Sequence, residues 1–194
     1  MIALSQLQWL EILAVALAVA YLLLAIRQQI WCWAAAAVST LLYLYIMYRA
    51  NLYMESALQL FYLAMAVYGW QQWRRPGGEG EELQVSTWTA RHHLLAIAAV
   101  ALLVMVSGEL LSRYTDAALP HVDSFTTWGA VVATYMVARK ILENWVYWFV
   151  IDAVSIGLYL SRELFFTAAL FAVYLVLIVI GYRTWRASMA QQPA

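Results

Sequence analysis

The chain has 194 residues, and its formal net charge at pH 7 is zero. Hydrophobic residues make up 65% of it and charged residues only 11%, whereas soluble domains carry roughly 25% charged residues, so we expect an integral membrane protein. The zero net charge gives no support to a nucleic-acid partner, and the single cysteine excludes an intrachain disulfide and a cysteine-based zinc site.

Seven apolar segments follow one another along the chain, with the length and composition typical of membrane helices. They cover roughly residues 12–26, 31–48, 56–73, 94–111, 125–138, 145–160 and 164–182. The first lacks the basic residues that open a cleavable signal peptide, so we expect it to remain as a helix. Residues 74–82, rich in Gly and charge, form the clearest linker. The sequence predicts an all-α integral membrane protein with seven transmembrane helices.

The sequence also repeats itself weakly at a spacing of 112 residues. At this offset Arg27 aligns with Arg139, Trp33 with Trp145, Tyr62 with Tyr174, Gly69 with Gly181 and Trp73 with Trp185. Each half then holds three helices, and the fourth helix joins them. Because three helices and one joining helix make an even number of crossings, both halves point the same way, which is a 3+1+3 parallel repeat. We expect one membrane domain made of a first repeat (1–75), a linker with the joining helix (76–113) and a second repeat (114–194).

Basic residues are distributed unequally between the two sides of such a bundle. Three arginines fall on one side, at positions 49, 113 and 162, and eight basic residues fall on the other, at positions 27, 74, 75, 91, 139, 140, 183 and 186. Connections rich in Lys and Arg stay in the cytoplasm. We therefore expect the N-terminus outside the membrane and the C-terminus in the cytoplasm.

The sixth segment carries the strongest candidate site, and it opens with Glu-Asn-Trp-Val-Tyr-Trp at 143–148. On a helix, one face carries two indoles, a carboxylate, a hydroxyl and a phenol, namely Trp145, Trp148, Asp152, Ser155 and Tyr159. Asp152 falls near the middle of the membrane, where an acidic side chain is costly and indicates a functional site. The alternative is that the indoles belong to an interfacial belt and that Asp152 pairs with another buried polar group.

Three further residues complete the predicted substrate site. Gln59 and Tyr62 share a polar face of the third segment, and Tyr43 follows Ser39 and Thr40 in the second. Gln59 could equally make an interhelical hydrogen bond, and the hydroxyls of Ser39 and Thr40 could bond back to their own helix. Because no phosphate-binding loop, metal cluster or catalytic arrangement stands out, we expect neither an enzyme nor a cofactor.

The Asn144-Trp145-x-x-Trp148 stretch with Asp152 beyond it, and the paired endings Gly69-Trp70-x-x-Trp73 and Gly181-Tyr182-x-x-Trp185, resemble the bacterial PnuC vitamin transporters. The resemblance implies a fold like that of SWEET sugar transporters. It also implies facilitated uptake of nicotinamide riboside through the inner membrane, and a cytoplasmic kinase that traps the product. Asn144, Trp145 and Trp148 would contact the substrate. The first half has Cys32-Trp33 and Ala36 at the matching positions, so the two halves would contribute unequally.

Other functions stay open at this stage. Relatives of this family carry thiamine, riboflavin or nucleosides, and the motif does not separate them. A proton-coupled carrier that uses Asp152 and a membrane scaffold without a substrate are two further alternatives, and a homo-oligomer is compatible with either. Since the motif has no Arg or Lys cluster to pair with a phosphate, we expect the phosphorylated mononucleotide to be rejected.

Overall fold

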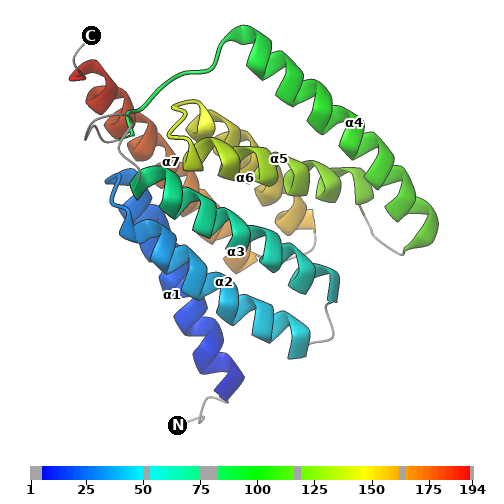
Figure 1. The fold of residues 1–194 in the computed structure, drawn as a ribbon. Coiled ribbons are helices and arrows are strands. Elements are labelled where there is room, and N and C mark those ends of the chain that lie inside the picture. The colour runs from blue at the N-terminus through cyan, green and yellow to red at the C-terminus, as the bar shows by residue number, and fades with distance from the viewer. Residues whose placement is uncertain (1–5, 50–52, 75–82, 116–118, 162–164, 193–194) are drawn as a thin grey trace. The chain divides into compact units, whose positions relative to one another are not determined.

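A computed structural model describes residues 6–49, 53–74, 83–115, 119–161 and 165–192, and these residues form seven α-helices (Figure 1). The helices are α1 (Gln6–Ile26), α2 (Trp31–Arg49), α3 (Tyr53–Arg74), α4 (Ala90–Tyr114), α5 (Pro120–Ala138), α6 (Asn144–Ser161) and α7 (Phe165–Ala190). The prediction of an all-α chain with seven helices is confirmed. The predicted linker from residue 75 onward, and Leu164, lie outside the described residues.

Several helices extend beyond the predicted apolar segments, and for two of them the sequence gives the reason. α5 begins at Pro120 and not near Phe125. Proline suits the first turn of a helix because its missing N–H would have no partner there, so the polar stretch before Phe125 is helical as well. α7 continues to Ala190, beyond the end of its apolar run at Tyr182, because Arg, Ala and Met are good helix formers.

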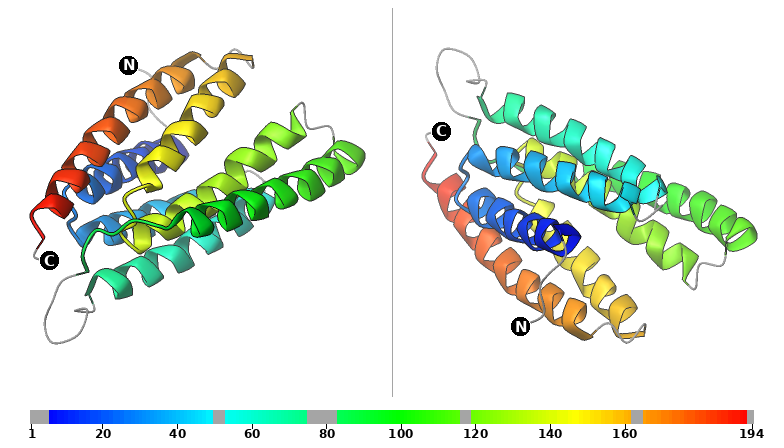
Figure 2. Two further views of the ribbon diagram at one scale, coloured as in Figure 1. Left: turned by 90° about the horizontal axis from the view of Figure 1, so that it is seen from above. Right: turned by 90° about the horizontal axis from the view of Figure 1, so that it is seen from below.

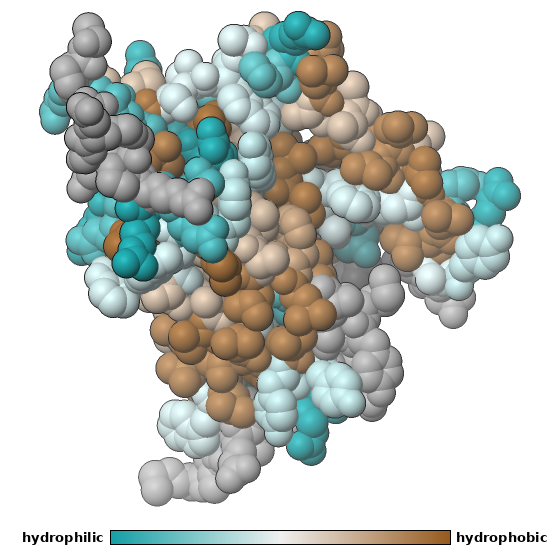
Figure 3. Space-filling view, viewed as in Figure 1, coloured by the Kyte–Doolittle hydropathy of each residue, from teal (hydrophilic) through white to brown (hydrophobic). Residues whose placement is uncertain are grey.

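Three of the described helices contain stretches long and apolar enough to cross a membrane by themselves: 9–26, 90–114 and 168–190. The apolar part of α2, Trp31–Ile46, is shorter. Hydrophobic residues dominate the exposed surface of α1 and α4 (Figure 3). Large apolar side chains exposed along whole helices are what lipid-facing positions require.

The chain divides into two compact units, 1–83 and 84–194. In the first unit, α2 packs against both α1 and α3. In the second, α5 packs against α4 and α6, and α6 packs against α7. Figure 2 shows α6 and α7 running side by side, as do α4 and α5. The joining helix α4 therefore belongs to the second unit.

The same aromatic packing holds each unit together. The Trp33 ring lies on Gly69 of α3 and meets Trp73 edge to face, with ring centroids 5.5 Å apart. In the second unit, Trp145 lies on Gly181 of α7 and meets Trp185 edge to face at 5.4 Å. Both glycines are required by this close approach, because an added Cβ would overlap the indole ring.

The turns that precede α2 and α6 also match. Gln28 and Lys140 both have positive φ, 54° and 50°. The backbone hydrogen bonds correspond at the 112-residue offset: Gln29 N–H donates to Leu24 at 2.9 Å and Ile141 N–H to Met136 at 2.9 Å, Gln28 N–H to Ala25 at 3.0 Å and Lys140 N–H to Val137 at 3.0 Å. Each unit thus contains the same turn, followed by a helix that is held by a buried tryptophan.

Candidate substrate site on helix α6

Asn144 is the first residue of α6, and its side chain is completely buried. Its Nδ2 donates to the carbonyl oxygen of Ile141 at 2.6 Å, which ties the start of the helix to the preceding turn. Its Oδ1 is buried and has no hydrogen-bond partner within the described residues. The Nδ2 group of the amide therefore stabilises the turn, while its Oδ1 remains available as an acceptor.

Trp145 is only 2% exposed. Its ring is enclosed by Gly181 and Trp185 of α7, as Trp33 is enclosed by Gly69 and Trp73 in the first unit. The structure thus assigns Trp145 a packing role between α6 and α7. A substrate contact by Trp145 stays a prediction.

Asp152 is 5% exposed. Its carboxylate has no hydrogen bond and no ion pair within the described part of the chain, so the pairing partner considered as the alternative is not among these residues. Trp148, which is half-buried, precedes it by four residues and therefore lies on the same face of the helix. This face brings an indole and an unpaired carboxylate together.

The other two polar residues of this face are occupied by local contacts. The Ser155 hydroxyl is buried and donates to the carbonyl of Ile151, one turn back, at 2.9 Å. The Tyr159 ring packs on Phe171 of α7, with centroids 4.9 Å apart. The predicted contact of Ser155 with substrate therefore requires the serine to accept a hydrogen bond while it donates to Ile151.

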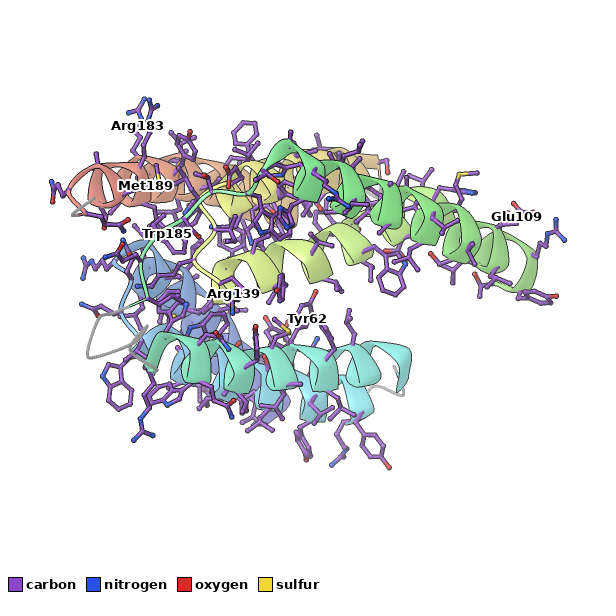
Figure 4. All side chains as sticks on the ribbon, turned by 45° about the horizontal axis from the view of Figure 1, so that its top comes forward. Tyr62, Glu109, Arg139, Arg183, Trp185 and Met189 are labelled. Carbon is purple, nitrogen blue, oxygen red and sulfur yellow. The ribbon has the colours of Figure 1, made fainter. Side chains whose placement is uncertain are left out.

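Gln59, Tyr62 and Tyr43 lie in the first unit, and all three are half-buried. Tyr62, labelled on α3 in Figure 4, packs edge to face on Phe61. For Ser39 the alternative of a bond back to its own helix does not hold, because its hydroxyl donates across to the carbonyl of Ala14 on α1 at 2.8 Å. Ser39 thus fastens α2 to α1.

A feature that the sequence analysis missed lies directly before the site. Residues 85–88, here called the strap, run beside the turn that opens α6. Ser86 N–H donates to the carbonyl of Lys140 at 3.0 Å, and Leu142 N–H donates to the carbonyl of Ser86 at 2.8 Å. Trp88 N–H donates to Oε2 of Glu143 at 3.3 Å. Three hydrogen bonds therefore tie the strap to residues 140–143, next to Asn144.

The strap continues into a polar cluster at the start of α4. His93 Nδ1 hydrogen-bonds the hydroxyl of Tyr147 at 3.0 Å, and its Nε2 lies 3.9 Å from Oε1 of Glu143. The Trp88 ring meets the His93 ring edge to face, with centroids 5.6 Å apart. The sequence signal for the strap was the presence of Val85, Thr87 and Trp88, three residue types that favour extended backbone, after a Gly-rich linker.

Among the described residues, no group of three or more His, Cys, Asp or Glu side chains could hold a metal ion. What α6 offers is an amide, a half-buried indole and a buried carboxylate along one helix. Such a set can bind a flat polar or cationic molecule.

Comparison with known proteins identifies the family. A family model described as the nicotinamide mononucleotide transporter matches residues 8–187, nearly the whole chain. The chain belongs to this family. It is 28% identical to the riboflavin/roseoflavin transporter RibM of Streptomyces davaonensis over 182 residues, which cover 91% of this chain and 84% of the relative.

Two further relatives are nicotinamide riboside transporters named PnuC. The protein from Neisseria mucosa is 28% identical over 76% of this chain and 60% of its own length, and the one from Escherichia coli K12 is 22% identical over 72% and 69%. A crystal structure of the vitamin B3 transporter PnuC superposes with a TM-score of 0.74 at 25% identity, covering 95% of this chain and 83% of that one.

These comparisons confirm the resemblance to the PnuC transporters. The chain is a multi-pass membrane transporter and not an enzyme. The names of its relatives, however, include both nicotinamide riboside and riboflavin carriers. Family membership therefore establishes that the chain transports a vitamin-type compound. Which compound it transports has to be argued from the residues of the site.

Proposed function

We propose that this protein takes up nicotinamide riboside through the bacterial inner membrane by facilitated diffusion. The observation that carries the proposal is Asp152, a buried carboxylate on a membrane helix that has no ion pair within the described residues. An unpaired charge at such a position is costly unless a partner or water reaches it. A cationic substrate that binds and leaves would be such a partner.

The chemistry of nicotinamide riboside matches this face of α6. Its pyridinium ring is flat and permanently charged, so it can stack on Trp148 by a cation–π contact while Asp152 supplies the opposite charge. The free acceptor on Asn144 can pair with a carboxamide or hydroxyl donor. A phosphate would bring a negative charge toward Asp152, and we therefore expect the mononucleotide to be excluded.

Facilitated diffusion alone lets the riboside equilibrate across the membrane and does not retain it inside. We propose that a cytoplasmic kinase phosphorylates the riboside and that the charged product, which the carrier rejects, stays inside. The kinase is then a functional partner that needs no contact with the carrier. In proteoliposomes that lack any kinase, labelled riboside should equilibrate and should not be concentrated.

We also propose that all seven helices cross the membrane, with the N-terminus outside and the C-terminus in the cytoplasm. The eight-to-three distribution of basic residues supports this orientation. The matched turns and the matched Trp–Gly contacts support a duplicated three-helix repeat, with 1–75 and 114–194 as the two copies and 76–113 between them. Reporters fused at the two ends should report opposite sides of the membrane, and two ends on the same side would contradict this arrangement.

Riboflavin is the second candidate, because RibM matches a larger share of this chain than the nicotinamide riboside transporters do. Its ring system is flat but uncharged, so it needs the indole of Trp148 and not the charge of Asp152. Thiamine, a flat cation, is the remaining competitor.

The test is a binding panel on the purified protein with nicotinamide riboside, its mononucleotide, thiamine and riboflavin. We expect the riboside to bind and the mononucleotide to bind far more weakly. Riboflavin binding without riboside binding would keep the family and replace the substrate. No binding of any compound, together with no transport, would favour a scaffold. Uptake driven by a pH gradient in vesicles held at zero membrane potential would favour proton coupling.

A further inference from the structure

A groove with a volume of about 380 Å³ runs between α6 and α7. Its floor is apolar, and it is formed by Trp145, Val146 and Phe149 of α6 and by Ile178 and Val179 of α7. Val146 and Phe149 are 50% and 42% exposed, so the groove presents open hydrocarbon surface. On a membrane helix, such a surface is available to an acyl chain.

One end of this groove is basic. Tyr182, Arg183 and Arg186 complete its lining, and both arginines are exposed. Figure 4 shows the Arg183 side chain extending outward from α7, on the opposite side from Trp185. Neither guanidinium has an acidic partner among the residues that the structure describes. Because Arg183 and Arg186 are three residues apart on one helix, both can reach a single anion.

We propose that this groove binds one anionic phospholipid, with an acyl chain on the apolar floor and the phosphate held by Arg183 and Arg186. A guanidinium offers several N–H donors that match phosphate oxygens, and basic pockets between membrane helices on the cytoplasmic side are suited to anionic headgroups. The apolar floor is what selects a lipid over a free phosphate. The Tyr182 hydroxyl supplies a further donor at the same end.

The corresponding surface of the first unit differs in the residues that matter. At the 112-residue offset, Phe149 corresponds to Ala37, Arg183 to Gln71 and Arg186 to Arg74. That surface keeps one arginine and lacks both the second arginine and the large apolar side chain. A second groove in the second unit, of about 520 Å³ among α4, α5 and α6, has a lining that is apolar apart from Tyr147. It carries no basic group to select a headgroup.

The groove shares Trp145 with the predicted substrate face, but its two arginines lie on α7 and are not among the predicted substrate residues, so the test is made on the arginines. The proposal therefore stands or fails without reference to what is transported. It predicts that the full-length purified protein retains anionic phospholipid in preference to zwitterionic phospholipid.

The experiment is native mass spectrometry of the detergent-purified chain, titrated with phosphatidylglycerol or phosphatidylcholine of identical acyl chains. Each of Arg183→Gln and Arg186→Gln should weaken phosphatidylglycerol binding by about fivefold, and the double variant by about 25-fold, with phosphatidylcholine unaffected. Arg74→Gln removes the same charge at the matching position of the first unit and should leave binding unchanged. Thermal denaturation in detergent without added lipid should show that all variants fold alike.

A competition arm separates a lipid from a free anion. Soluble glycerol phosphate in large excess should fail to displace phosphatidylglycerol, because it lacks the chain that covers the groove floor. Displacement at concentrations comparable to the lipid would assign the arginines to a soluble phosphate and overturn the proposal. Equal binding of both lipids, or unchanged phosphatidylglycerol binding in the double variant, would also overturn it.

Discussion

The turn before α2 and the turn before α6 share their backbone and differ in their side chains. Both contain a residue with positive φ, and their hydrogen bonds correspond one for one. Both are followed by a buried tryptophan on a helical glycine. Yet Cys32 corresponds to Asn144, Ala36 to Trp148 and Thr40 to Asp152. The two units share this packing framework, whereas the amide, the second indole and the carboxylate at these three positions occur in the second unit.

The strap adds a second difference. Glu143 accepts the hydrogen bond from Trp88, whereas the matching position at the start of α2 is Trp31, which is 64% exposed. An indole has no acceptor that could hold a backbone N–H in this way. The turn that opens the candidate site is therefore fastened from outside by residues 85–88. We infer that the second unit keeps this turn fixed so that Asn144 is held in position.

The largest effect is expected from the shared framework. Gly69→Ala and Gly181→Ala should each destabilise the protein by about 1–3 kcal/mol, because the added methyl group overlaps Trp33 or Trp145. Gly157→Ala is the matched control, since nothing lies within 4 Å of a Cβ at that helical position. Thermal unfolding in detergent measures all three. A loss in only one of Gly69→Ala and Gly181→Ala would break the equivalence of the two units.

The second-largest effect is expected from a side chain that differs between the two units. Trp148→Ala should weaken nicotinamide riboside binding at least tenfold, or by about 1.4 kcal/mol, through loss of the cation–π contact. Trp31→Ala, which removes an exposed indole from the start of α2, serves as the control and should leave affinity unchanged. Isothermal titration of both variants gives the comparison. Equal losses would mean that the chemistry is not concentrated in α6.

The smallest effect is expected at the strap. Glu143→Gln should cost about 0.5–1.5 kcal/mol of stability, because a charge-assisted hydrogen bond to Trp88 becomes a neutral one. Hydrogen exchange at the Leu142 amide, which donates to the carbonyl of Ser86, should become faster in the same variant. Glu109→Gln removes a carboxylate from an exposed pair with Arg113 and should change neither quantity measurably. Unchanged exchange in Glu143→Gln would show that Glu143 does not hold the strap.

Part of this account was available from the sequence. The seven apolar runs predicted the seven helices, and the helical spacing placed Trp148 and Asp152 on one face. The strap was not predictable, because its pairing with residues 140–143 joins segments more than fifty residues apart through backbone atoms. The packing of Trp145 on Gly181 was not predictable either. It depends on the distance between α6 and α7, and a periodic sequence pattern does not give that distance. Local sequence patterns therefore predicted the helices and the candidate face of α6. Contacts between segments distant in sequence determine which side chains of that face remain available to a substrate.

The measurement that tests the central claim most directly is nicotinamide riboside binding to Asp152→Asn, set beside Asp152→Ala. The account assigns Asp152 the role of counter-charge to a cationic ring. Both variants should insert and fold, and both should lose at least tenfold in affinity for the riboside, which corresponds to about 1.4 kcal/mol. Full affinity in Asp152→Ala would contradict the assignment of the site. Full affinity in Asp152→Asn alone would show that a hydrogen bond suffices and that the carboxylate charge plays no part.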